Sequence, residues 1–113
     1  MNIPSSEHNG VTVLALDGAI LGGPEASALN EELHRLIDAG KHKVVIDLGN
    51  VALMNSSGLG MLIGAYTTVK NNGGDLKLAA LNENVRKLIE MTKLHTIFTP
   101  YDGVEEAVAS FAP

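Results

Sequence analysis

Two adjacent serines, Ser56 and Ser57, are the side chains of this sequence best placed to do chemistry. They follow Asn55 and precede apolar residues at helical spacing, which predicts that they lie at the start of a helix. The free N–H groups and the dipole of a helix start favour an anion. A phosphate on Ser56 would add about −1.5 to −2 charges there without unfolding the domain. Ordinary helix capping by Asn55 or Ser56 explains the same residues with no regulatory role.

Other kinds of chemical site find little support. With no cysteine, disulfides, thiolate metal sites and cysteine nucleophiles are excluded. The histidines stand apart, without metal-ligand spacing, at His8, His34, His42 and His95. Gly58, Gly60 and Gly64 superficially match a dinucleotide fingerprint, and Asp75 lies where a ribose-binding acid is sought. About ten residues separate the expected strand end at Asp47 from Gly58, however, whereas the fingerprint begins directly after a strand. We therefore expect no catalytic residue, no metal and no cofactor.

Composition bounds the class of protein. The 113 residues fit a single domain spanning 1–113, and 45% hydrophobic residues are enough to build a core. The net charge of −5 and the scattered basic residues argue against nucleic acid. Residues 1–10 lack the basic start of a signal peptide, and the apolar runs are far below the roughly 20 residues that span a bilayer. We expect a cytoplasmic protein with no direct membrane insertion, a monomer or weak dimer.

The elements that must position the two serines begin with strands. We predict strands at residues 2–7, 11–16, 44–46, 76–81 and 97–99. Asn9-Gly10 is a strong hairpin signal between the first two, and Asp17-Gly18 is expected to end the second. Residues 47–54 are expected to be irregular, and Lys77 to point outward.

Four helices complete the prediction. The first begins at Pro24, which suits the first helical position, and the second ends at residues 71–74. Asn82 is expected to cap the third, and Asp102 the fourth, with Glu105 completing an approximate capping box. Strands that alternate with helices predict an α/β fold in which helices pack on a mixed sheet.

Residues 44–66 resemble the signature of STAS domains, which occur in bacterial anti-sigma factor antagonists. In that signature a buried strand ends in Asp-Leu, and an apolar pair, Asp-Ser-Ser/Thr-Gly-Leu-Gly and an apolar helix follow. The matching residues are Val45, Ile46, Asp47, Leu48, Val51, Met54, Ser56, Ser57, Gly58, Leu59 and Gly60. The likeness extends over nearly the whole chain, including residues 11–18, 73–78, 88–98 and 104–111. It implies the STAS fold, a mixed sheet of about four or five strands packed with about four helices.

The resemblance also implies a function, that of a partner-switching regulator of transcription. In the family, the first serine of the pair is phosphorylated by an anti-sigma factor with serine-kinase activity; here that serine is Ser56. The unmodified antagonist binds this anti-sigma factor, the phosphorylated form releases it, and a PP2C-type phosphatase resets the cycle. The switch and partner-binding residues would be Met54, Asn55, Ser56, Ser57, Gly58, Leu59 and Leu21. The alternative is a STAS subunit of another assembly, such as a lipid-trafficking transporter or a stressosome-like complex.

The chain departs from the family's pattern at two positions. The family usually has Asp immediately before the acceptor serine, where this chain has Asn55. A second acid often lies three positions after the glycine that closes the second strand, where this chain has Leu21. Both changes make the expected switch surface less acidic and more apolar.

Overall fold

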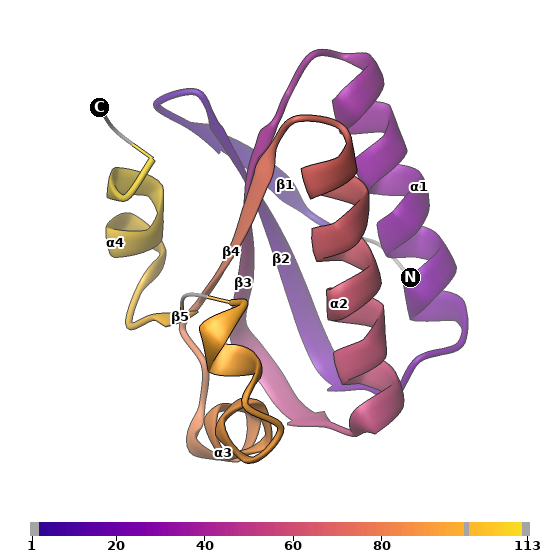
Figure 1. Ribbon diagram of the computed structural model, residues 1–113, viewed down its shortest axis with the longest axis vertical. Coiled ribbons are helices and arrows are strands. Elements are labelled where there is room, and N and C mark those ends of the chain that lie inside the picture. The colour runs from indigo at the N-terminus through magenta and orange to yellow at the C-terminus, as the bar shows by residue number, and fades with distance from the viewer. Residues whose placement is uncertain (1–2, 99, 112–113) are drawn as a thin grey trace.

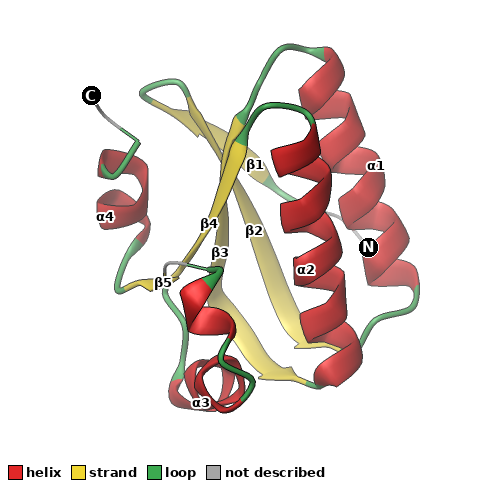
Figure 2. Ribbon diagram, viewed as in Figure 1, coloured by secondary structure: helices red, strands yellow, loops and turns green. Residues whose placement is uncertain are grey.

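A computed structural model describes residues 3–98 and 100–111 of the chain. The hydrophobic periodicity of the sequence produces a five-stranded sheet with helices on both faces (Figures 1 and 2). In chain order, the elements are β1 (Ser5–His8), β2 (Val11–Ile20), α1 (Pro24–Asp38), β3 (Lys43–Met54), α2 (Ser56–Asn71), β4 (Asp75–Ala79), α3 (Glu83–Met91), a 3₁₀ turn (Leu94–Thr96), β5 (Pro100–Tyr101) and α4 (Val104–Ala109).

The strands lie in the order β1-β2-β3-β4-β5. β1 is antiparallel to β2, and the other neighbours are parallel, so the predicted mixed sheet and its helices are confirmed. The predicted hairpin between β1 and β2 is confirmed as well. Its two turn residues, Asn9 and Gly10, have positive φ values of 54° and 82°. That geometry suits the twist of the flanking strands.

Two layers of apolar residues flank the sheet. Helices α1 and α2 lie side by side on one face and the short α4 lies on the other (Figure 1). The larger core, beneath α1 and α2, includes Leu14, Ile46 and Leu78 from the three central strands. The neighbouring positions Val13 and Val45 point to the opposite face and pack with α4. This alternation is the period of two that a strand imposes on its side chains.

Two strands are longer than the sequence predicts. β2 continues through Asp17-Gly18 to Ile20, and β3 continues past Asp47 to Met54, so the expected strand break and the expected irregular segment are both wrong. Irregularities in the ladder explain the difference, because the register between the two strands shifts between Ala15 and Asp17 and again between Gly18 and Ala19. Bulges of this kind let a strand continue through residues that interrupt its alternation.

The ends of the chain also differ from the prediction. The first strand covers Ser5–His8 rather than residues 2–7, and Asn2 lies outside the described residues. Ile97 and Phe98 follow a 3₁₀ turn and form no strand, whereas Thr99 lies outside the described residues. The last strand is instead Pro100–Tyr101.

The predicted cap of the last helix and the predicted orientation of Lys77 are wrong too. α4 begins after Gly103 with no side-chain cap, and Asp102 instead lies 3.4 Å from the guanidinium of Arg86. Lys77 does not point freely outward, since it is half-buried with its amine 2.8 Å from Ser110 Oγ near α4. Within the described ranges, no helix is both long and apolar enough to cross a membrane.

Candidate functional site

The site is built where β2 and β3 end together. Their parallel ladder pairs Ala19 with Leu53 and Ile20 with Met54 as its last two rungs. The last rung is buried, since the Ile20 side chain is fully enclosed and the Met54 side chain is nearly so. α2 begins two residues after Met54, so the ladder fixes where the helix starts.

Gly58 holds the start of α2 against this ladder. A Cβ atom on Gly58 would overlap the carbonyl oxygen of Ile20 and lie 3.0 Å from Met54 Cγ. Glycine is therefore required here by close approach of two backbones. Leu59, the next residue, is buried in the core, so the first turn of α2 is anchored by its inner face.

Asn55 caps the helix from the outside. Its backbone is extended, and its side-chain oxygen accepts a hydrogen bond from the Gly58 N–H at 2.9 Å. Its carbonyl oxygen accepts the first helical bond from the Leu59 N–H, also at 2.9 Å. Of the two candidate caps, Asn55 and Ser56, Asn55 takes this role in the structure.

The two serines differ in their surroundings although both are exposed. Ser57 lies beside the loop that follows β2, where a Cβ atom on Gly22 would be 3.1 Å from Ser57 Cβ. Gly22 has a φ of 90°, a left-handed conformation in which a side chain is strained. Among the described residues, neither serine hydroxyl makes a hydrogen bond to a protein group. The two serines therefore differ in their neighbours and not in hydrogen bonding.

The structure divides the seven predicted switch residues into two groups. Leu21, Asn55, Ser56 and Ser57 are exposed on the same end of the molecule, whereas Met54, Gly58 and Leu59 are buried beneath them. The buried three hold the exposed four in place.

Sequence reasoning missed Leu53, whose side chain is 52% exposed. Burial does not alternate around Leu53, because Ala52 and Leu53 are both exposed between the buried Val51 and Met54. The period of two therefore gives no signal for Leu53 in the sequence.

The electrostatics of this end are simple. No lysine or arginine occurs in residues 1–34 or 44–69. These ranges include β2, the loop after it, β3 beyond Lys43 and nearly all of α2. The charged side chains of β2, and of β3 beyond Lys43, are the carboxylates of Asp17 and Asp47. The second accepts a hydrogen bond from the Gly49 N–H at 2.9 Å, which orders the strand locally. An added phosphate would therefore find no cationic side chain on these segments.

A metal or dinucleotide finds no fitting residues here. Among residues 3–98 and 100–111, no group of three or more histidines, aspartates or glutamates is close enough to hold a metal ion. Because β3 runs to Met54, the expected gap of about ten residues between the strand and Gly58 is wrong. The contact with Ile20 already requires a glycine at position 58, so Gly58 is explained without a dinucleotide.

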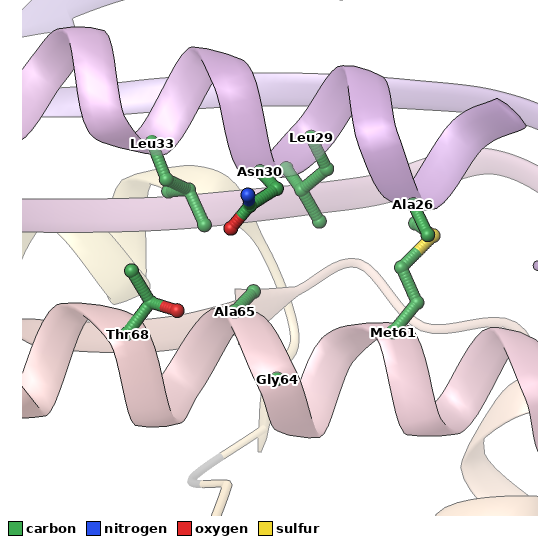
Figure 3. Close-up of a pocket in the computed structure, with 8 residues that line it drawn as sticks. All are labelled: Ala26, Leu29, Asn30, Leu33, Met61, Gly64, Ala65 and Thr68. Atoms are coloured by element: carbon green, nitrogen blue, oxygen red, sulfur yellow. The ribbon is translucent and has the colours of Figure 1, made fainter.

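A hollow lies between α1 and α2 (Figure 3). It has a volume of about 190 Å³, and Figure 3 shows side chains from both helices directed into it. The lining residues are Ala26, Leu29, Asn30, Leu33, Met61, Gly64, Ala65 and Thr68. Charged groups are missing from this set, so the hollow offers no catalytic machinery.

Comparison with known proteins identifies the fold and its motif. Residues 2–107 match the STAS domain family. This chain belongs to the STAS domain family. The STAS chain is 28% identical over 109 residues to the anti-sigma F factor antagonist of Paenibacillus polymyxa, covering 96% of this chain and 92% of that protein. It is 39% identical over 72 residues to the anti-sigma-B factor antagonist of Bacillus subtilis, covering 64% of this chain and 65% of that one.

Solved structures agree with the STAS fold. An anti-sigma factor antagonist from Mycobacterium paratuberculosis superposes with a TM-score of 0.83 at 25% identity, over 99% of this chain and 94% of that chain. SpoIIAA superposes in its unphosphorylated form with a TM-score of 0.71 at 16% identity, over 96% of each chain. Its phosphorylated form gives 0.72 at 17% identity, over 96% of this chain and 98% of that chain. At such low identity, the two SpoIIAA structures show the fold alone.

Proposed function

We propose that this STAS domain is an anti-sigma factor antagonist that binds its partner while Ser56 is unmodified and is released when Ser56 is phosphorylated. The observation that carries the proposal is the exposed Ser56 hydroxyl in the first turn of α2, free of hydrogen bonds to the described residues. The names of the Paenibacillus polymyxa and Bacillus subtilis relatives support the same function. In this proposal residues 1–113 act as one domain in the cytoplasm.

The helix start supports phosphorylation without unfolding. Asn55 occupies the Gly58 N–H, while the Ser56 and Ser57 N–H groups lie in the first turn, where no helical carbonyl can accept from them. Those donors and the helix dipole stabilise a phosphate on Ser56 in the free protein. The first turn of α2 is held against β2 by the contact between Gly58 and Ile20. Modification of Ser56 therefore changes the surface and leaves the fold intact.

The same phosphate opposes binding. Burying a doubly charged group against a partner is costly unless a cation pairs with it. The segments that build this end carry no lysine or arginine, so the STAS domain itself supplies no such pair from them. A loss of about 3 kcal/mol would weaken the complex by about two orders of magnitude. That difference is sufficient for a switch.

Two enzymes complete the proposed cycle. The partner is an anti-sigma factor with serine-kinase activity that uses ATP to modify Ser56, and a PP2C-type phosphatase removes the phosphate. The STAS domain contributes no catalytic group, metal or cofactor of its own. Within the site, Asn55, Ser56, Ser57 and Leu21 form the contact surface, and Met54, Gly58 and Leu59 hold it in place.

Incubation with ATP and the anti-sigma factor kinase of the same organism tests the proposal. Mass spectrometry is expected to find one phosphate, on Ser56, in the unaltered chain and in Ser57→Ala, and none in Ser56→Ala. Ser56→Ala is expected to bind the kinase as tightly as the unaltered chain, whereas Ser56→Asp is expected to bind at least tenfold more weakly. Phosphate on Ser57 alone, or equal affinity of Ser56→Asp, would contradict the proposal. Recovery of transporter or stressosome subunits in a pull-down would favour the alternative assembly.

A further inference from the structure

Two exposed leucines lie beside the phosphoacceptor. Leu21 is 47% exposed and Leu53 is 52% exposed, and they are two of the four large hydrophobic residues that are exposed in the described part of the chain. A single exposed leucine needs no explanation. Two of them on one edge of the sheet, next to a modification site, call for one.

The ladder places both leucines on that edge. Leu53 pairs with Ala19, so these two side chains stand on the same outer face of the parallel strands. Leu21 follows Ile20, the last residue of β2, whose rung partner is Met54. Ile20 and Met54 point into the core, so the leucines on either side of this rung are left outside it.

The loop after β2 connects Leu21 to the start of α2. Gly22, its neighbour, lies against Ser57, and a Cβ atom added to Gly22 would be 3.1 Å from Ser57 Cβ. The leucine surface, defined as Leu21 and Leu53 with Ala19, is therefore continuous with the first turn of α2. A partner that covers Ser56 also reaches it.

Charge indicates what kind of partner fits. The segments that carry the leucine surface contain no lysine or arginine. The leucines themselves carry no negative charge that could pair with a basic side chain of a partner. A basic side chain placed opposite the leucines would lose its water without gaining a carboxylate, which strongly disfavours binding. An apolar side chain there would bury both leucines at no such cost.

We propose that Leu21 and Leu53 are anchor residues that select an anti-sigma factor whose facing surface is apolar and uncharged. The proposal rests on the proposed function, since it names the partner chemistry of the same site. Few residues carry most of the energy of an interface, and they sit in fully desolvated contacts near its centre. The leucines determine which anti-sigma factor is bound, and Ser56 determines when it is bound.

Isothermal titration of the full chain with the anti-sigma factor that it binds tests the proposal. Leu21→Asp and Leu53→Asp are each expected to lower affinity at least tenfold, and Leu21→Gln and Leu53→Gln to lower it by a smaller factor. Met91→Asp, at a side chain that is 81% exposed on α3, is the matched control and is expected to bind like the unaltered chain. Affinity of the unaltered chain is expected to change little with added salt, because no ion pair holds the leucine surface. Circular dichroism and thermal melts report whether each variant is folded.

The outcomes separate this proposal from the function on which it rests. If the unaltered chain binds the anti-sigma factor and is released on phosphorylation, while both aspartate variants bind equally well, only the leucine proposal is overturned. A steep fall in affinity with salt would overturn it as well. If the unaltered chain binds no anti-sigma factor at all, the proposed function fails first.

Discussion

The backbone of α2 at Gly58 touches the carbonyl group of Ile20 so closely that a methyl group on Gly58 would overlap that oxygen. This contact joins the end of β2 to the first turn of the helix that carries Ser56. The geometry of the site therefore depends on a residue with no side chain. Two changes at this site test how it is held, and two others test contacts elsewhere in the fold.

Gly58→Ala is expected to destabilise the protein, because the new methyl group must push α2 away from β2. Overpacking of this kind costs roughly 1–3 kcal/mol. Gly60→Ala and Gly64→Ala are the matched controls in the same helix, where a Cβ atom would meet nothing within 4 Å. Each control is expected to stabilise the protein by about 0.5–1 kcal/mol. Urea unfolding measures all three, and a neutral Gly58→Ala would contradict the close contact.

Asn55→Ala is expected to lower the free energy of unfolding by about 1 kcal/mol, since it removes the side-chain oxygen that accepts from the Gly58 N–H. Asn55→Asp keeps an acceptor and adds a negative charge at the helix start, so it is expected to raise stability by about 0.3–1 kcal/mol at low salt. Asn50→Ala, at an exposed position on β3, serves as the control. Equal stability of Asn55→Ala and Asn50→Ala would argue against the cap.

Glu7 is expected to make stability depend on pH. The hydroxyl of Thr12 donates a hydrogen bond to its carboxylate and Lys41 Nζ lies 3.4 Å away, and these contacts outweigh burial to hold the pKa of Glu7 below its ordinary value of 4.5. Its contribution is present above 4.5 and is lost as pH falls through the lower folded pKa. Glu7→Gln is expected to flatten this acid loss in urea unfolding, while Glu31→Gln on α1 leaves it unchanged. A Glu7→Gln curve parallel to that of the unaltered chain would contradict the assignment.

Lys77→Met is expected to loosen α4. The Lys77 amine lies 2.8 Å from Ser110 Oγ and 4.4 Å from the ring centroid of Phe111, so one cation holds the last residues of the described chain. Losing these contacts is expected to cost about 1–2 kcal/mol. Hydrogen exchange of the α4 amides is expected to quicken, whereas Lys87→Met on α3 is expected to leave it unchanged. Unaltered exchange in Lys77→Met would show that α4 is held by its apolar face alone.

Local signals predicted the parts of this fold that local interactions determine. Asn9-Gly10 forms the hairpin turn, Pro24 begins α1, and Asn82 accepts the Val85 N–H at the start of α3. Each of these depends on residues that are neighbours in the chain. The start of α2 at Ser56 belongs to the same class.

Long-range pairing explains most of what the sequence did not reveal. β2 and β3 each run beyond the predicted strand because each supplies the other with hydrogen-bonding partners, as in the rung of Gly18 and Val51. The exposed position of Leu53 depends on that extension. Asp102 pairs with Arg86 from another helix rather than capping its own. None of these partners can be read from spacing along the chain.

The last two rungs of β2 and β3 have a consequence for how such proteins diversify. Ile20 and Met54 belong to the interior, while Ala19, Leu21 and Leu53 face outward from the same backbone. Substitutions at the outward positions leave the interior unaltered, so they are nearly free of a folding cost. If the leucines select the partner as proposed, a duplicated gene needs only a few such substitutions to acquire a different partner and keep the same serine. Parallel signalling pathways would then be kept apart by side chains that contribute almost nothing to folding.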